Sequence, residues 1–119
     1  MNGDDADDVL AAHEETGIAL AEVIESLQQG LTRIQRIREE RLSGDPYLDI
    51  LSRGEGQLLV RTLTENLQSL QRHGHRLRRA EARALRAEGA STARIAELFG
   101  VSRQRVLVLL GSEHDQPES

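Results

Sequence analysis

The chain contains no cysteine, no lysine and no tryptophan, and Tyr47 and Phe99 are its only large aromatic side chains. The absence of cysteine excludes both a disulfide bond and a thiolate metal site. With so few aromatic residues among 119, a large globular core is not expected. The composition favours a small aliphatic, helical protein, either as one small domain or as a helical oligomerisation arm with a small head.

Long apolar runs are also missing from the sequence. No stretch of about 18 apolar residues occurs, so no membrane-spanning helix is predicted. The acidic N-terminal segment lacks the apolar core of a secretory signal peptide. We therefore expect a protein of the reducing cytoplasm with no membrane partner.

The net charge of −5 is distributed unevenly along the chain. Residues 1–25 carry eight acidic residues and no arginine, whereas residues 72–105 carry nine arginines and three acidic residues. Salt screens charges that lie more than about 10 Å apart, so a ligand senses the local field rather than the net charge. The basic segment therefore favours an anionic partner such as DNA, although the chain as a whole is acidic.

Residues 9–42 have the periodicity of a long amphipathic helix. Alternating steps of four and three residues separate Leu20, Ile24, Leu27, Leu31 and Ile34, and Val23 and Ile37 widen this stripe. Residues 1–8 precede the pattern and are expected to form a disordered acidic lead-in. The Ser-Gly-Asp-Pro segment at 43–46 ends the helix, and residues 47–52 are predicted to form a short helix or turn.

A second long helix is predicted from Gln57 to Glu88. Its apolar residues alternate three and four positions apart, as in a coiled coil or helical bundle. The predicted dimerisation residues are Val60, Leu63, Leu67, Leu70 and Leu77. A stripe of this length needs a partner, which is the first long helix in an antiparallel hairpin, the same helix of a second subunit, or both. We favour a homodimer, since two-fold symmetry is the usual state of small DNA-reading proteins.

The segment 88–110 is the most informative part of the chain, with the pattern of two short helices joined by a glycine turn. Ala96 falls where two crossing helices touch and only a small side chain fits, and Gly100 falls in the turn, where a left-handed backbone favours glycine. Ser91 and Ser102 precede the two helices as N-caps. Apolar contacts are predicted at Ile95, Phe99, Val101, Val106 and Leu109.

This segment resembles the helix-turn-helix of sigma factor region four, of resolvase-type recombinases and of small bacterial transcription regulators. The residues that carry the resemblance are Ser91, Ile95, Ala96, Phe99, Gly100, Val101, Ser102, Arg103 and Val106. They lie in about the last quarter of the chain. The resemblance implies a helix-turn-helix fold that binds in a DNA groove, and it leaves the target sequence open.

On this resemblance, a helix over about residues 102–110 enters the major groove of double-stranded DNA. Arg103 and Gln104 are expected to read base edges, because arginine pairs bidentately with guanine and glutamine with adenine. Leu107 is expected to contact a thymine methyl group. Phosphate contacts are expected from Thr92, Arg94, Ser102, Arg105, Arg83 and Arg86.

The continuous apolar run from Leu107 to Leu110 supports a second interpretation. DNA-reading helices often carry polar side chains at the positions that Leu107 and Val108 occupy. If this run packs against another element or subunit, the chain is a helical interaction module for RNA polymerase, a sigma factor or another regulator. Salt dependence separates the two interpretations, because phosphate contacts weaken steeply as salt rises.

The sequence contains no arrangement typical of an enzyme or a cofactor site. His73 and His75 are two residues apart and so do not share a helix face, and no cysteine or third nearby histidine completes a metal site. The aspartates at 4, 5, 7 and 8 are interpreted as a solvated charge run. We therefore expect no catalytic residue, no metal and no cofactor.

Taken together, these patterns predict an all-α fold in four parts. They are a disordered lead-in over 1–8, a long helical hairpin or coiled-coil arm that dimerises over 9–77, a helix-turn-helix head over 78–111 and a disordered tail over 112–119. The predicted function is that of a sequence-specific DNA-binding transcription regulator acting as a homodimer.

Overall fold

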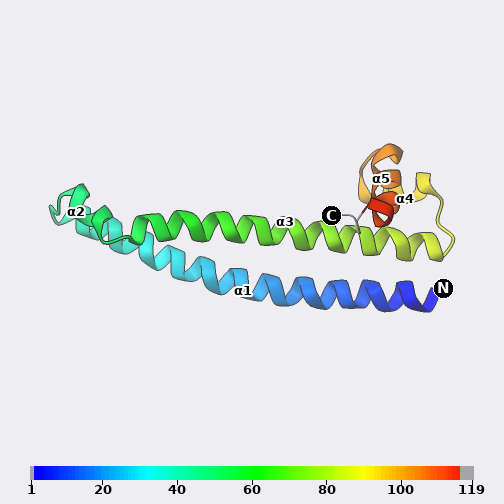
Figure 1. Ribbon diagram of the computed structural model, residues 1–119, viewed down its shortest axis with the longest axis horizontal. Helices are drawn as coiled ribbons and strands as arrows, with labels where there is room; N and C mark the ends of the chain where they lie inside the picture. The colour runs from blue at the N-terminus through cyan, green and yellow to red at the C-terminus, as the bar shows by residue number, and fades with distance from the viewer. Residues whose placement is uncertain (1, 116–119) are drawn as a thin grey trace. The chain divides into compact units, whose positions relative to one another are not determined.

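The computed structural model describes the backbone of residues 2–115 and the side chains of residues 7–111. This part of the chain forms helices and contains no strand, so the predicted all-α class is confirmed. The helices are α1 (Asn2–Leu42), α2 (Tyr47–Ser52), α3 (Glu55–Ala87), α4 (Thr92–Phe99) and α5 (Arg103–Asp115) (Figure 1). Within residues 2–115, no helix has both the length and the apolar character that a membrane span requires.

Several helix boundaries differ from those predicted. The lead-in over 1–8 is wrong for residues 2–8, because α1 already begins at Asn2. Acidic residues near a helix N-terminus interact favourably with the positive end of the helix dipole. The tail predicted from residue 112 is likewise helical up to Asp115. Met1 and residues 116–119 lie outside the described residues.

The chain divides into two compact units. Unit 1 consists of Met1–Thr16 and His73–Ser119, and unit 2 consists of Gly17–Arg72. The predicted boundary between arm and head at residues 77 and 78 therefore differs from the observed division. The first turns of α1 belong with α4 and α5, a long-range association that local periodicity does not encode.

In unit 2, α1 and α3 are antiparallel and joined by α2. The Asn66 side chain donates a hydrogen bond to Ser26 Oγ at 3.0 Å, and nearer the connection Arg36 forms an ion pair with Glu55 at 2.7 Å. The later residue of α1 is thus paired with the earlier residue of α3. The two helices therefore run in opposite directions. The hairpin predicted for this part of the chain is therefore present within unit 2.

Small side chains form the seam between α1 and α3 in unit 2. Ala19 and Val23 of α1 are buried, as is Leu59 of α3. Gly30 is buried beside Leu59, and a Cβ at residue 30 would lie 3.3 Å from Leu59 Cδ1. Small residues allow two helix backbones to approach closely, and the apolar area buried in such a seam stabilises the pair.

Most predicted stripe residues of both helices lie outside this seam, whereas Val23, which widens the α1 stripe, lies in it. In unit 2 the exposed stripe residues are Leu20, Ile24, Leu27, Leu31 and Ile34 on α1 and Val60, Leu63, Leu67 and Leu70 on α3. The antiparallel hairpin, one of the predicted arrangements, therefore leaves these residues partly exposed. The sequence pattern locates the apolar positions of each helix. However, two neighbouring faces of each helix have a spacing suitable for helix packing. The face with the smaller residues forms the contact between α1 and α3.

The α2 helix covers the end of the hairpin in unit 2. Ile50 of α2 is almost fully buried, at 1% exposure. Arg53 follows α2 and forms ion pairs with Glu40 at 2.7 Å and Asp45 at 3.5 Å. Gly44 supplies a positive φ of 100° where α1 ends, a conformation that costs little without a Cβ.

In unit 1, the start of α1 packs beside the C-terminal part of α3. Ala12 of α1 and Ala80 of α3 are both buried. Arg76 of α3 donates hydrogen bonds to Glu15 at 3.1 Å and to Asp8 at 3.0 Å. The acidic start of the chain thus contributes both small apolar contacts and carboxylates to this unit.

The opposite side of α3 packs against α4 and α5. Residues two positions apart point to nearly opposite sides of a helix, and Ala82 accordingly belongs to a different cluster from Ala80. The buried members of this cluster are Ala82, Ile95, Ala96, Val106 and Leu109, and the half-buried residues around them are Leu85, Ala90, Phe99 and Leu110. This core fixes α4 and α5 relative to the end of α3 within unit 1.

Candidate functional site

The α4 helix begins with the predicted serine cap. Ser91 has an extended backbone, with φ −75° and ψ 160°, and its hydroxyl accepts a hydrogen bond from the Arg94 backbone N–H at 3.0 Å. Such a bond satisfies one of the N–H groups that a helix N-terminus leaves without an intrahelical partner. The prediction that Ser91 caps this helix is therefore confirmed.

A glycine turn joins α4 to α5. Gly100 has φ 70° and ψ 32°, which lies in the left-handed region. The Val101 N–H donates to the Ala96 carbonyl at 3.0 Å and the Gly100 N–H donates to the Glu97 carbonyl at 3.3 Å. These two bonds form a Schellman motif, which ends α4 and redirects the chain. The predicted role of Gly100 is confirmed.

The start of α5 uses the second predicted cap. Ser102 Oγ accepts a hydrogen bond from the Arg105 N–H at 3.1 Å, and its carbonyl accepts one from the Val106 N–H at 3.2 Å. With its hydroxyl and carbonyl so engaged, Ser102 fixes where α5 starts and which side of it faces the core. The prediction that Ser102 is an N-cap is confirmed.

The α5 helix has one buried and one exposed side along its described residues. Val106 and Leu109 are buried in the core with Ile95 and Ala96 of α4. The three predicted base-reading residues, Arg103, Gln104 and Leu107, are all exposed. One predicted apolar contact, Val101, is also exposed, because it lies in the turn outside the core.

The apolar run at the end of α5 is divided between these two sides. Leu109 is buried at 1% exposure, but Leu107 and Val108 are 52% and 49% exposed. The interpretation that Leu107 and Val108 pack against another element of this chain is therefore wrong for the described residues. Helical periodicity separates neighbours by about 100°, so four consecutive apolar residues do not all face one core.

The structure brings Arg94 of α4 together with Arg103 of α5. They line a shallow depression of about 550 Å³, and the remaining lining residues are Ser91, Ala93 and Glu97. Arg94 Nη1 also lies 2.7 Å from Glu97 Oε1, so this predicted phosphate ligand forms an ion pair within α4. Glu97 was not among the predicted site residues, although its position three residues after Arg94 is typical of a helical ion pair.

Two other predicted phosphate ligands lie together where α3 meets α4. Arg86 of α3 donates a hydrogen bond to Thr92 Oγ1 at 3.3 Å. Arg83 lies one helical turn earlier in α3 and is half-buried. Arg86 and Thr92 are therefore adjacent, whereas Arg83 is less accessible than a phosphate ligand requires without rearrangement.

Arg105 lies on the flank of α5 that faces α3, away from Arg103. Burial lowers the pKa of His75, and the positive charges of Arg79 and Arg105 lower it further. The pKa of Arg79 is itself lowered by burial and by the nearby charges of Arg83 and Arg76. These mutual effects define a positively charged cluster of α3 and α5 residues, which sequence spacing alone does not predict.

Two further arginine contacts in unit 1 were not predicted. The Arg78 guanidinium lies over the Phe99 ring, 4.1 Å from the ring centroid, and this cation–π contact joins α3 to α4. The hydrogen bonds that Arg76 donates to Glu15 and Asp8 raise the pKa of Arg76. Some arginines of the basic segment therefore have a structural role. The segment as a whole is not available to an anionic ligand.

The predicted dimerisation residues lie in two different environments. Val60, Leu63, Leu67 and Leu70 are exposed on α3 in unit 2, whereas Leu77 belongs to unit 1 and is half-buried. Within the described part of the chain, no group of three or more His, Cys, Asp or Glu side chains is placed to hold a metal ion. The arrangement that remains is a shallow, arginine-containing surface on α4 and α5.

No protein-family model matches the chain, and no match is found among curated proteins or among solved structures. The function is therefore inferred from the residues of this chain and their arrangement.

Proposed function

We propose that the protein is a sequence-specific DNA-binding transcription regulator, that it acts in the cytoplasm as a homodimer, and that α4 and α5 form a helix-turn-helix. The observation that carries this proposal is the division of α5 into two sides. Val106 and Leu109 are held in the core, while Arg103, Gln104 and Leu107 are exposed together. A helix anchored in this way presents one row of side chains to a DNA groove.

Base reading is assigned to the N-terminal half of α5. Arg103 donates to guanine O6 and N7, and Gln104 pairs with adenine, since both side chains offer the bidentate geometry that distinguishes these bases. Leu107 lies one turn after these residues and contacts a thymine methyl group. Leu107 is 52% exposed, so its side chain is accessible for such an apolar contact.

Phosphate binding is assigned to the residues on either side of this row. Arg94 and Thr92 at the start of α4 contact one strand, together with Ser102 and Arg86. Arg83 of α3 and Arg105, on the side of α5 that faces α3, contribute to the positive field. Such contacts position the protein on the duplex, while the base contacts specify the sequence.

Selection of bound fragments from random double-stranded DNA tests this proposal. We expect the wild-type chain to enrich one sequence that contains two related half-sites, because a homodimer reads DNA with two-fold symmetry. Arg103→Ala should weaken binding to this sequence by about 1–3 kcal/mol and relax the preference at one base pair. Gln104→Ala should relax the preference at a different base pair.

The matched control is Arg61→Ala, which removes the same charge from α3 in unit 2. Arg61 is exposed and lies in unit 2, whereas α4 and α5 belong to unit 1. This variant should keep the selected sequence and most of the affinity. If the wild-type chain enriches no sequence at low salt, the proposal of sequence-specific binding fails.

A second candidate function is supported by the exposure of Leu107 and Val108. In this alternative, α5 contacts another transcription protein such as RNA polymerase or a sigma factor. Salt dependence distinguishes the two. Binding through about six phosphates weakens by roughly 10³-fold between about 50 and 200 mM salt, whereas an apolar protein contact changes little. Leu107→Gln should abolish a protein contact but reduce DNA affinity only modestly.

A further inference from the structure

Unit 2 carries a large apolar surface that its own hairpin does not cover. The surface consists of the two exposed stripes, and we call it the leucine face. Its residues are Leu20, Ile24, Leu27, Leu31 and Ile34 of α1 and Val60, Leu63, Leu67 and Leu70 of α3. Each of these side chains is between 36% and 62% exposed.

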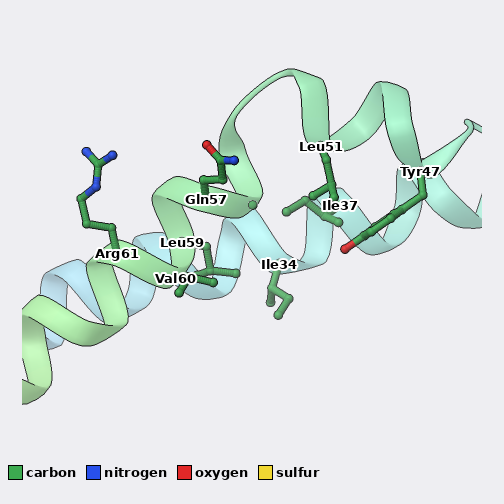
Figure 2. Close-up of a pocket in the computed structure, with 9 residues that line it drawn as sticks. Ile34, Ile37, Tyr47, Leu51, Gln57, Leu59, Val60 and Arg61 are labelled. Atoms are coloured by element: carbon green, nitrogen blue, oxygen red, sulfur yellow. The ribbon is translucent and has the colours of Figure 1, made fainter.

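The two stripes lie on the same side of the hairpin. A groove of about 570 Å³ at the α2 end of unit 2 is lined by Ile34 from one stripe and Val60 from the other. Figure 2 shows these two side chains beside each other, with Leu51 and Tyr47 of α2 continuing the apolar lining. The stripes therefore form one continuous surface across both helices.

The size of the leucine face matches one side of a stable protein interface. Its side chains together expose on the order of 800 Å², whereas a monomeric protein usually leaves no more than a few hundred Å² in one apolar patch. A standard interface buries about 800 Å² on each partner. The leucine face is thus large enough to form an interface with a partner surface of the same area, without contacts elsewhere.

The positions that flank the two stripes one helical turn away carry no charge, although Arg61 lies beyond them and lines the groove beside Val60. The residues that flank the stripes one helical turn away are Ala21, Gln28 and Gln35 on α1 and Gln57, Thr64 and Gln71 on α3, and all of them are exposed. Charges at such flanking positions normally select a different partner by attraction or exclude an identical one by repulsion. Uncharged flanking positions allow the leucine face of one chain to meet the identical face of a second chain without repulsion. They offer no complementary charge to a different, charged partner.

We infer that the leucine face of a second copy of this chain covers the leucine face of the first, so that two hairpins form a four-helix bundle. This inference rests on the homodimeric state in the proposed function and specifies its interface, but it does not depend on DNA binding. It assigns α1 an equal part in dimerisation, in addition to the α3 residues predicted from the sequence. An isologous interface of this kind is typical of two-fold dimers.

Charge substitutions in the middle of the face test the inference. Light scattering should give twice the mass of one chain for the wild type and one chain mass for Leu27→Glu and Leu63→Glu, because each symmetric dimer would bury two such carboxylates. The matched control is Ile18→Glu, since Ile18 is 63% exposed on α1 and lies outside the leucine face. It should remain dimeric. Far-UV circular dichroism should show that all three variants stay helical.

Introduced cysteines provide a second measurement that leaves the face apolar. The chain has no native cysteine, so a single cysteine reports on one position. We expect Leu27→Cys copies to form disulfide-linked dimers with one another or with Leu63→Cys copies, depending on the direction of the two-fold axis. Ile18→Cys copies should not crosslink.

Three outcomes would overturn the inference. They are a monomeric wild type at micromolar concentration, dimeric Leu27→Glu and Leu63→Glu variants, or an absence of crosslinks in both cysteine combinations. The failure of the proposed function is distinguishable, because a dimer that selects no DNA sequence contradicts DNA reading alone. A monomer that still selects a sequence contradicts the leucine-face dimer alone.

Discussion

Gly30 of α1 lies so close to Leu59 of α3 that a Cβ on residue 30 would be 3.3 Å from Leu59 Cδ1. This contact is part of the seam that joins the two helices of unit 2. It explains why a glycine is retained in the interior of a long helix, where glycine costs about 1 kcal/mol relative to alanine. On α1 the buried seam residues are Ala19, Val23 and Gly30, and the leucines and isoleucines beside them remain exposed for another partner.

A large residue at position 30 should destabilise unit 2. We expect Gly30→Leu to lower the free energy of unfolding by about 1–3 kcal/mol, because the added side chain overlaps the buried Leu59. Gly17→Ala is the contrasting change, since a Cβ there meets nothing within 4 Å, and it should stabilise the helix by up to about 1 kcal/mol. Urea unfolding followed by circular dichroism at one fixed protein concentration measures both. Equal effects of the two substitutions would contradict the close seam.

The turn between α4 and α5 requires glycine. Gly100→Ala should destabilise unit 1 by about 1–2 kcal/mol, because alanine is strained at a φ of 70°. Gly111→Ala is the matched control within α5, where a Cβ has open space, and it should be neutral or stabilising. Thermal unfolding measures the difference. A Gly100→Ala variant as stable as the wild type would show that the turn does not hold the left-handed conformation.

Removal of the Glu97 charge should strengthen the proposed DNA binding. Glu97 pairs with Arg94 at 2.7 Å and lies in the same depression as Arg103. Glu97→Gln frees Arg94 and removes repulsion from phosphates, so we expect up to about a fivefold gain in affinity, the effect of a surface ion pair worth about 1 kcal/mol or less. Glu65→Gln, which removes an exposed acid of unit 2, should change affinity much less. Fluorescence anisotropy with the selected DNA measures both, and a loss of affinity in Glu97→Gln would contradict the assigned surface.

Acid should destabilise unit 1 through His75. Its pKa in the folded chain is lowered by burial and by Arg79 and Arg105, whereas in the unfolded chain it lies near 6.5. The folded state therefore binds this proton more weakly, so the His75 contribution to stability is complete above about pH 6.5 and is lost as the pH falls below that value. His75→Gln should reduce the loss of thermal stability between about pH 7.5 and 5.5.

Arg105→Gln gives an independent check of the same cause. Removal of this positive charge should raise the pKa of His75, which an NMR titration of the imidazole measures directly. It should also reduce the acid sensitivity of the melting temperature. An unchanged His75 titration in Arg105→Gln would show that Arg105 does not act on this histidine.

Local signals in the sequence predict much of the α4–α5 arrangement. The caps at Ser91 and Ser102 and the left-handed turn at Gly100 follow from the backbone chemistry of these residue types, and the structure contains all three. The helical periodicity also predicts the burial of Val106 and Leu109. The ion pair of Glu97 with Arg94 was not predicted, although its spacing of three residues is typical of a helical ion pair.

The sequence alone determined the helical class, the approximate extent of the long helices and the positions of their apolar stripes, because these depend on interactions between residues a few positions apart. Only the tertiary structure decided which face of each of the two long helices is buried. In unit 2 it places Gly30 against Leu59 and leaves Leu27 and Leu63 exposed. The physical reason is that two helices pack through the faces that allow the closest approach, and this depends on the partner as well as on the spacing of apolar residues.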